Sequence, residues 1–394
     1  MAIPVNIRSF KEFFKSNSAG GIILIICVII SLFVANSSLG ADFEKILAKN
    51  IGIKNDYFNL QYSVLNWIND ALMAIFFLLI GLEIKRELLE GELSSVQKAS
   101  LPVLAAFGGA IIPAIIFFVI NKDTPVESGW GIPMATDIAF ALAVISMLGS
   151  RVPASLKIFL AALAIVDDLI AILVIAIFYS NGLHVDQLFY ALAIIGFLGV
   201  LNRLKVRSLW AYILPGIFVW YFIHHSGIHA TIAGVLTAMV IPTTRGRKES
   251  PLEKLEHLLH KPVNFIIMPL FALANTNISF ENTSAEMIGS GLSVGIIAGL
   301  LVGKPLGIML FSWLAVKLKA GVLPAEARWS HILGLGILGG IGFTMSIFIA
   351  LLSFDNSELQ TAAKISVLIT SAFAGLVGYL LLNFIGNKPI VSNR

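Results

Sequence analysis

The 394-residue sequence predicts an all-α protein that crosses a membrane about twelve times. Hydrophobic residues make up 57% of the chain and charged residues only 13%, well below the roughly 25% that a soluble domain carries. Apolar runs recur from end to end, and a run of about 20 residues crosses the hydrocarbon as a helix. This composition excludes a soluble globule and a disordered chain, and the single cysteine, Cys27, excludes a disulfide scaffold.

Each apolar run is expected to form one membrane-spanning helix. The runs cover approximately residues 19–36, 66–82, 101–120, 130–148, 158–179, 188–201, 209–223, 229–241, 263–274, 288–316, 332–352 and 365–384. The ninth is short and contains Pro269, and the tenth is long enough to bend at Pro305. The first run could alternatively be a signal peptide, because Arg8, Lys11 and Lys15 precede it; the eleven further spans favour a membrane helix.

Basic residues are distributed unevenly between the loops. If both termini lie on one side, that side collects 21 of the 27 Lys and Arg residues, the opposite loops hold five, and one lysine lies within a span. The positive-inside rule then places both termini in the cytoplasm. The basic residues form short clusters and no continuous stripe, so nucleic acid is not an expected partner.

The most basic loop, residues 242–262, is expected to contain a short amphipathic helix. Ser250 and Glu253 have the spacing of a capping box, with Pro251 at the first helical position. This helix could simply lie on the bilayer surface. Alternatively, its titratable side chains could act together as a cluster: Glu256, His257 and His260.

Five charged residues fall within or at the edge of the spans: Asp70, Asp137, Asp167, Asp168 and Lys304. A charge at membrane depth costs at least about 2.5 to 3.5 kcal/mol, so such residues face protein or water and are functional candidates. Asp70 is the weakest candidate, because it lies near the start of the second span and could serve an ordinary helix entry.

Asp167 and Asp168 are adjacent in the middle of the fifth span. Consecutive helical residues diverge by about 100 degrees, so both carboxylates can border one cavity without sharing an orientation. Two neighbouring carboxylates in a low-dielectric site cannot both stay ionised without a cation, so one is expected to hold a proton that a small cation could displace. The alternative is an ion pair that only ties helices together.

The fourth and eleventh spans are predicted to be discontinuous. Glycines and Pro133 crowd the start of the fourth span directly before Thr136 and Asp137, and five glycines precede Thr344 in the eleventh. Paired Gly/Pro-interrupted spans in the two halves of a chain indicate a transporter with an inverted repeat and a midplane site. Crossed half-helices would bring positive and negative helix ends together, and Asp137 and Lys304 have the signs to neutralise them.

Simpler interpretations exist for several of these residues. Glycines also permit close helix packing, although packing alone does not explain an aspartate beside the break in the fourth span. Lys304 could extend its ammonium to the membrane interface. His229 opens the eighth span and is either a local hydrogen-bonding group or a pH-responsive residue.

Seven segments resemble, in the same order, those of the NhaA family of bacterial Na⁺/H⁺ antiporters, and the match covers nearly the whole chain. They are NDALMAIFFLLIGLEIKREL, MATDIAFALAV, ALAIVDDLIAI, HSGIHATIAGV, LEHLLHKPVNFIIMPLFALAN, GKPLGI and GGIGFTMSIFIA. The resemblance implies that Asp167 and Asp168 form the Na⁺ and H⁺ site. It places Thr136 and Asp137 in the broken-helix region and pairs Lys304 with Asp167 when the site is empty of sodium.

The resemblance also implies pH regulation and a homodimer. The residues that match the pH-response positions of the family are Glu83, Lys254, Glu256, His257 and His229. The family dimerises through an extracellular hairpin after the first span, which would fall within residues 37–61. That segment has no Asn-Gly turn, so the sequence itself does not predict the hairpin.

The expected function is alternating-access exchange of cytoplasmic Na⁺ or Li⁺ for external H⁺, electrogenic in this family, in the bacterial cytoplasmic (inner) membrane. No cofactor and no covalent chemistry are expected, so the protein is not expected to be an enzyme. An intramembrane aspartyl protease would need a Gly-Asp dipeptide, which the chain lacks. The main alternative is an ion-coupled symporter of a small organic solute, which should line its cavity with more polar side chains.

Overall fold

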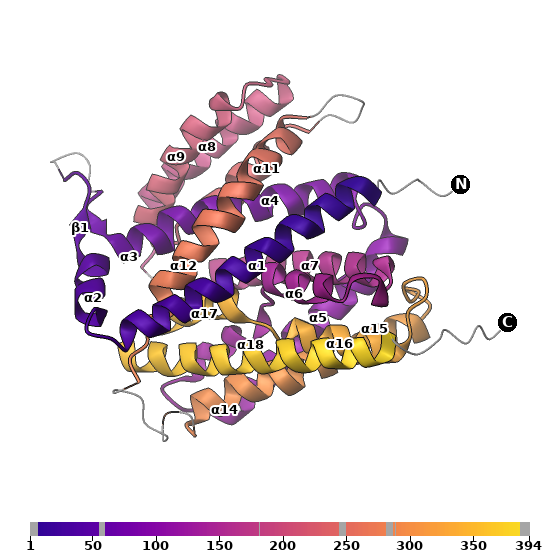
Figure 1. Ribbon diagram of the computed structural model, residues 1–394. Helices are drawn as coiled ribbons and strands as arrows, with labels where there is room; N and C mark the ends of the chain where they lie inside the picture. The colour runs from indigo at the N-terminus through magenta and orange to yellow at the C-terminus, as the bar shows by residue number, and fades with distance from the viewer. Residues whose placement is uncertain are drawn as a thin grey trace. The chain divides into compact units, whose positions relative to one another are not determined.

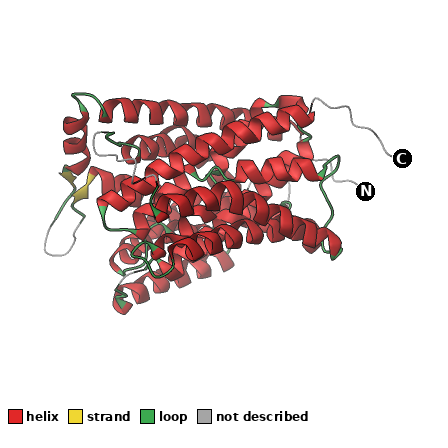
Figure 2. Ribbon diagram, turned by 90° about the horizontal axis from the view of Figure 1, so that it is seen from below, coloured by secondary structure: helices red, strands yellow, loops and turns green. Residues whose placement is uncertain are grey.

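The computed structural model describes residues 7–54, 60–180, 182–243, 250–280, 287 and 289–386, and for residues 7–18 the backbone only. The described chain is helical apart from loops and one antiparallel strand pair (Figure 2), as the sequence predicts. It divides into two compact units. Unit 1 comprises Met1–Ile26, Ser95–Ile170 and Thr283–Arg394, and unit 2 comprises Cys27–Ser94 and Ala171–Asn282.

Unit 1 contains the two spans that the sequence predicts to be broken. Figure 1 labels the α-helices of this unit. Its elements are the first part of α1 (Ile7–Ala35), α5 (Val96–Asn121), η2 (Glu127–Met134), α6 (Ile138–Met147), η3 (Gly149–Arg151), most of α7 (Ala154–Phe178), α14 (Gly291–Ala298), η5 (Gly299–Gly303), α15 (Lys304–Lys317), α16 (Trp329–Gly339), α17 (Phe343–Ser353) and α18 (Ser357–Gly386). Helices α5 and α15 approach closely at Gly108 and Gly307, where a side chain on either residue would overlap the carbonyl oxygen of the other. Small residues at this crossing let two backbones touch.

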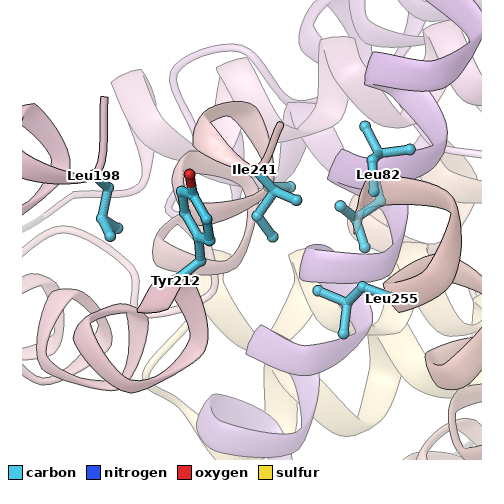
Figure 3. Close-up of a cluster of buried hydrophobic side chains, with 7 residues drawn as sticks. Leu82, Leu198, Tyr212, Ile241 and Leu255 are labelled. Atoms are coloured by element: carbon cyan, nitrogen blue, oxygen red, sulfur yellow. The ribbon is translucent and has the colours of Figure 1, made fainter. Parts of the chain in front are cut away.

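Unit 2 contains the strand pair and the remaining helices. Its elements are α2 (Gly40–Ala48), β1 (Asn50–Ile51), β2 (Tyr62–Ser63), α3 (Val64–Asn66), η1 (Trp67–Leu72), α4 (Met73–Glu90), α8 (Val185–Arg203), α9 (Trp210–His225), α10 (Ile232–Val240), α11 (Pro251–Pro262), η4 (Val263–Ile267) and α12 (Met268–Asn275). Helices α8 and α9 run side by side (Figure 1). Figure 3 shows the apolar cluster that ties this unit together, in which Tyr212 and Ile241 lie between Leu198 on one side and Leu82 and Leu255 on the other.

Within the described residues, fewer helices than the twelve expected spans have the length and composition to cross a membrane. Eight helical segments of the described chain are long and apolar enough to cross a membrane, or up to ten if each of two bent pairs is one span. The bent pairs are α1 with α2, at 110°, and α16 with α17, at 46°. The two remaining expected spans correspond to α9 and α10, whose 16 and 9 residues fall short of the roughly 20 that a perpendicular span needs.

The expected amphipathic helix exists but is not separate from the ninth span. Ser250 caps the N-terminus of helix α11: its hydroxyl accepts from the Glu253 amide at 3.2 Å, and the Glu253 carboxylate accepts from the Ser250 amide at 2.7 Å. It continues through the π-helical turn η4 into α12, giving one stretch from Pro251 to Asn275. Another π turn, η5, precedes Pro305 just as η4 precedes Pro269. A wider turn accommodates a proline, which lacks an amide donor and collides with the preceding turn.

Two loop segments singled out in the sequence are only partly described. Within residues 37–61 the structure shows α2 and strand β1, and β1 pairs with β2 in the register Asn50 to Ser63 and Ile51 to Tyr62. Residues 55–59 of that segment, and residues 244–249 of the basic loop, lie outside the described chain.

Candidate functional site

Both predicted helix breaks are present, and both lie in unit 1. Helix η2 ends at Met134, the backbone is extended from Ala135 to Asp137, and α6 begins at the next residue. Glycine and proline supply no helix-stabilising side chain in this segment, whereas the carboxylate of Asp137 can start a new helix. In the eleventh span, α16 ends at Gly339 and α17 begins at Phe343.

The two breaks are bonded directly to each other. The Thr136 hydroxyl donates to the carbonyl oxygen of Gly339 at 2.8 Å, and the Asp137 amide donates to that of Ile341 at 2.7 Å. The Ser346 hydroxyl donates back to Ile132 at 2.7 Å. Because backbone groups without partners are costly in a membrane, each break supplies the donors that the other one lacks.

Asp137 caps the N-termini of two half-helices at once. Its Oδ1 accepts from the Phe140 amide in α6 at 2.9 Å. Its Oδ2 accepts from the Thr344 hydroxyl at 2.5 Å and the Thr344 amide at 3.2 Å, in the first turn of α17. The positive ends of both helices therefore converge on one buried carboxylate, as their dipoles favour.

Lys304 lies at the opposite, negative end of a half-helix. Its ammonium donates to the carbonyl oxygen of Met134, the last residue of η2, and to Asp167 Oδ2 at 2.5 Å. The lysine is 0% exposed and Asp167 is 1% exposed, so the pair is sealed from solvent. This placement rules out an ammonium extended to the membrane interface. Thr136 also lies against the Asp167 carboxylate.

Asp168 is fully buried on the next position of α7, and its charge acts on Lys304. The structure thus brings together the five residues expected at the ion site and the helix breaks: Thr136, Asp137, Asp167, Asp168 and Lys304. Carboxylate, hydroxyl and carbonyl oxygens are hard ligands that suit a small alkali cation. With one ammonium beside two carboxylates, the centre can balance its charge with protons, with the lysine or with a bound cation.

A second group of charges, buried or partly buried, joins α4 to α11 in unit 2. The Arg86 guanidinium pairs with Glu256 Oε1 at 3.2 Å and with Glu87 Oε1 at 3.1 Å. Glu83, one turn earlier on α4, is buried and interacts electrostatically with both Arg86 and Glu256. Sequence reasoning missed Arg86 and Glu87, although they follow Glu83 by three and four residues and therefore share its helix face.

The other residues expected to respond to pH are not buried within this group, although the charge of His257 acts on Glu256. Lys254 and His257 are on the exposed face of α11. His229 lies with Asp70: its Nε2 is 3.7 Å from Asp70 Oδ1, and His224 Nδ1 is 3.9 Å from Asp70 Oδ2. Asp70 lies in the first turn of the π-helical segment η1, six residues after α3 begins at Val64.

A multi-pass membrane protein in which two helix breaks cross beside buried carboxylates and a lysine belongs to the class of secondary transporters. The chain belongs to the Na⁺/H⁺ antiporter 1 family, whose profile matches residues 11–382. It is 60% identical to Na⁺/H⁺ antiporter NhaA 2 of Flavobacterium johnsoniae over 97% of this chain and 94% of the relative. It is 51% identical to NhaA of Flavobacterium psychrophilum over 98% of both chains, and 47% identical to NhaA of Escherichia coli over 94% and 97%.

Proposed function

We propose that the protein exchanges Na⁺ or Li⁺ for H⁺ by alternating access, with Asp167 and Asp168 as the shared site. The observation that carries the proposal is the fully buried contact of 2.5 Å between Lys304 and Asp167, directly beside Asp168. A lysine at this position holds the place of a transported cation. Membership of a family whose relatives are named Na⁺/H⁺ antiporters supports the same exchange.

The exchange depends on competition for the same carboxylates. A Na⁺ ion and the Lys304 ammonium repel each other at Asp167, so sodium binding requires that the lysine withdraw or lose its proton. Sodium also displaces the proton that Asp167 and Asp168 share. The carbonyl of Met134 and the hydroxyl of Thr136 lie next to these carboxylates and supply further oxygen ligands.

Asp137 acts in this proposal as a fixed anion and not as a transported-ion ligand. Both of its oxygens accept from the half-helix N-termini, so binding a cation there would break bonds that hold the crossing together. Its negative charge also keeps two positive helix ends from repelling a cation at Asp167.

We further propose that exchange is electrogenic and regulated by pH through the α4–α11 charges. Glu83 and Glu256 are buried around Arg86, which is itself partly open to water with a side-chain exposure of 35%. Lys254 and His257 are exposed on α11, and from the solvent side their charges change the electrostatic potential at these buried carboxylates. His229 responds to pH separately, through its contact with Asp70.

The proposed setting is the bacterial cytoplasmic (inner) membrane, with both termini in the cytoplasm. The excess of basic residues in the loops of that side supports this orientation. We propose a homodimer that pairs through the segment around β1, whose two residues are both exposed. An exposed strand edge offers unpaired backbone groups to a second copy.

Everted membrane vesicles that hold a proton gradient test the exchange directly. Addition of NaCl or LiCl should release protons, and choline chloride, which supplies the same anion without a small cation, should not. Absence of Na⁺-driven proton release at every pH from about 6.5 to 9 would refute the antiporter proposal.

A further inference from the structure

Helix α17 begins without a capping side chain of its own. The residue before its first turn is Gly342, which carries no side-chain oxygen to accept an amide. A side chain at this position would overlap Ser346 Oγ, which donates to the carbonyl oxygen of Ile132 in the other break at 2.7 Å. A cap supplied by neighbouring helices avoids this collision and still satisfies the amides at the start of α17.

Two other helices supply these acceptors. Asp137, at the start of α6, takes the amide and the hydroxyl of Thr344. The amide of Phe343, the first residue of α17, donates to Ser371 Oγ of α18 at 3.0 Å. Phe343 is 2% exposed and Ser371 is 3% exposed, so water cannot replace this acceptor. The positive end of α17 is thus shared between one charged and one neutral acceptor.

Ser371 lies on the face of α18 that packs against the crossed breaks. Gly375 follows it by one turn, and a Cβ on Gly375 would lie 3.6 Å from Phe140 Cε1 and 3.7 Å from Ile341 Cδ1. Phe140 belongs to the first turn of α6, and Ile341 directly precedes the cap of α17. Helix α18 therefore contacts the starts of both half-helices beside the proposed ion site.

We infer that Ser371 is a positioning residue of the cation site, whose hydroxyl holds the first turn of α17 so that Thr344 stays bonded to Asp137. The inference rests on the proposed function, in which Na⁺ binds at Asp167 and Asp168 beside the fixed charge of Asp137. A neutral serine fixes the helix end without adding a second charge. Asp137 alone then supplies the negative potential that the cation experiences from this end.

Loss of the Ser371 hydroxyl would leave the buried Phe343 amide without its acceptor. The start of α17 then presents more positive potential, and more of the Asp137 charge is used to balance it. A helix end changes the binding of a nearby charge by about two- to fivefold. Ser371→Ala should therefore raise the Kd for Na⁺, and the KM for Na⁺-driven exchange, by about two- to fivefold.

The test measures Na⁺ binding to the purified full-length protein by calorimetry, and exchange in everted vesicles, at one fixed pH. Ser366→Ala is the matched control, because Ser366 is a buried serine of the same helix whose hydroxyl donates to Ala362 of that helix at 2.8 Å. Ser371→Thr keeps the hydroxyl and should restore the wild-type Kd. Ser371→Cys keeps the size with a weaker acceptor, and it should raise the Kd by a smaller factor even if Ser371→Ala does not fold.

Thr344→Val tests whether Ser371 acts through Asp137. This substitution removes the hydroxyl that donates to Asp137 Oδ2. Ser371→Ala should then raise the Kd less in the Thr344→Val background than in the wild type, because the two residues hold the same helix end. An equal increase in both backgrounds would contradict the inferred route.

A raised Kd in Ser371→Ala, with normal values in Ser366→Ala and Ser371→Thr, supports the inference. A Ser371→Ala protein that is less stable but binds Na⁺ with the wild-type Kd would overturn it, because Ser371 would then serve the fold and not the site. Wild-type protein that neither binds nor exchanges Na⁺ would refute the proposed function itself, whatever the Ser371 variants do.

Discussion

The charges of unit 1 and those of unit 2 are stabilised in different ways. At the crossed breaks, the countercharges are helix ends and one lysine, and every carboxylate is buried. Between α4 and α11, an arginine that is partly open to water holds Glu256 and Glu87. The first arrangement can change its charge only by exchanging an ion, whereas the second can take up or release protons through its exposed edge.

This difference predicts that the crossed breaks carry out ion exchange and that the α4–α11 charges set its dependence on pH. Substitutions at the crossing should remove exchange or destabilise the fold, because each charge there is balanced against a fixed helix dipole or a single partner. Substitutions between α4 and α11 should leave exchange intact and change its dependence on pH. Three experiments of decreasing effect test whether the two regions separate in this way.

Asp168→Asn should have the largest effect. Replacing this buried carboxylate by an amide removes a negative charge that balances the cation, and leaving a buried cation without its counter-charge costs about 3 to 5 kcal/mol, or a factor of about a hundred or more. We expect no measurable Na⁺-driven proton release in vesicles that contain normal amounts of the protein. Asp355→Asn, which changes an exposed carboxylate of the same unit, is the control and should exchange normally. Retained transport in Asp168→Asn would remove this residue from the site.

Asp137→Ala should act mainly on stability. It removes the cap of two half-helices, and one lost cap costs about 0.5 to 2 kcal/mol, so the free energy of unfolding in detergent should fall by about 1 to 4 kcal/mol. Asp137→Asn keeps an acceptor oxygen and should lose less. Ser250→Ala removes the cap of α11 only and serves as the single-helix comparison. Equal losses for Asp137→Ala and Ser250→Ala would show that the double cap adds nothing.

Arg86→Gln should have the smallest effect on the maximal rate. Without the guanidinium, the positive charge that faces Glu83 and Glu256 is lost, so the pH of half-maximal exchange should rise by about one unit, or roughly 1.4 kcal/mol. Arg86→Lys keeps the charge and should shift the profile less. Exchange measured between about pH 6 and pH 9 gives both values. An unchanged dependence of exchange on pH would show that the α4–α11 charges do not regulate the protein.

The sequence predicts the all-α class. It also predicts the charged residues near the crossed helix breaks, because a charge in an apolar span has few explanations. Asp167 and Asp168 lie at mid-span, and glycine and proline interruptions in the apolar runs mark both breaks. The signs of Asp137 and Lys304 also predict which helix ends they face, and the structure confirms both placements. These predictions hold because a membrane restricts buried charges more severely than water does.

Other features depend on long-range packing that one sequence does not reveal. Nothing local indicates that Asp137 bonds with Thr344, 207 residues away, or that one carboxylate caps two helices. The continuity of α11 with α12 is not predicted, because a proline and a capping box suggest two separate segments, whereas a π turn joins them. Lys254 and His257 match the family pattern but lie on an exposed helix face, which only the orientation of α11 decides.

The wide separation of bonded partners has a consequence for how the protein is made. Lys304 follows Asp167 by 137 residues, and Thr344 follows Asp137 by 207. At a synthesis rate of about 5 to 20 residues per second, Asp137 emerges at least about ten seconds before the residue that completes its cap. Until then the Asp137 carboxylate has only its own half-helix as a partner, through the Phe140 amide. A chain that stops short of α17 lacks the Thr344 hydroxyl and amide that bond Asp137 Oδ2, although it already contains Lys304, the partner of Asp167.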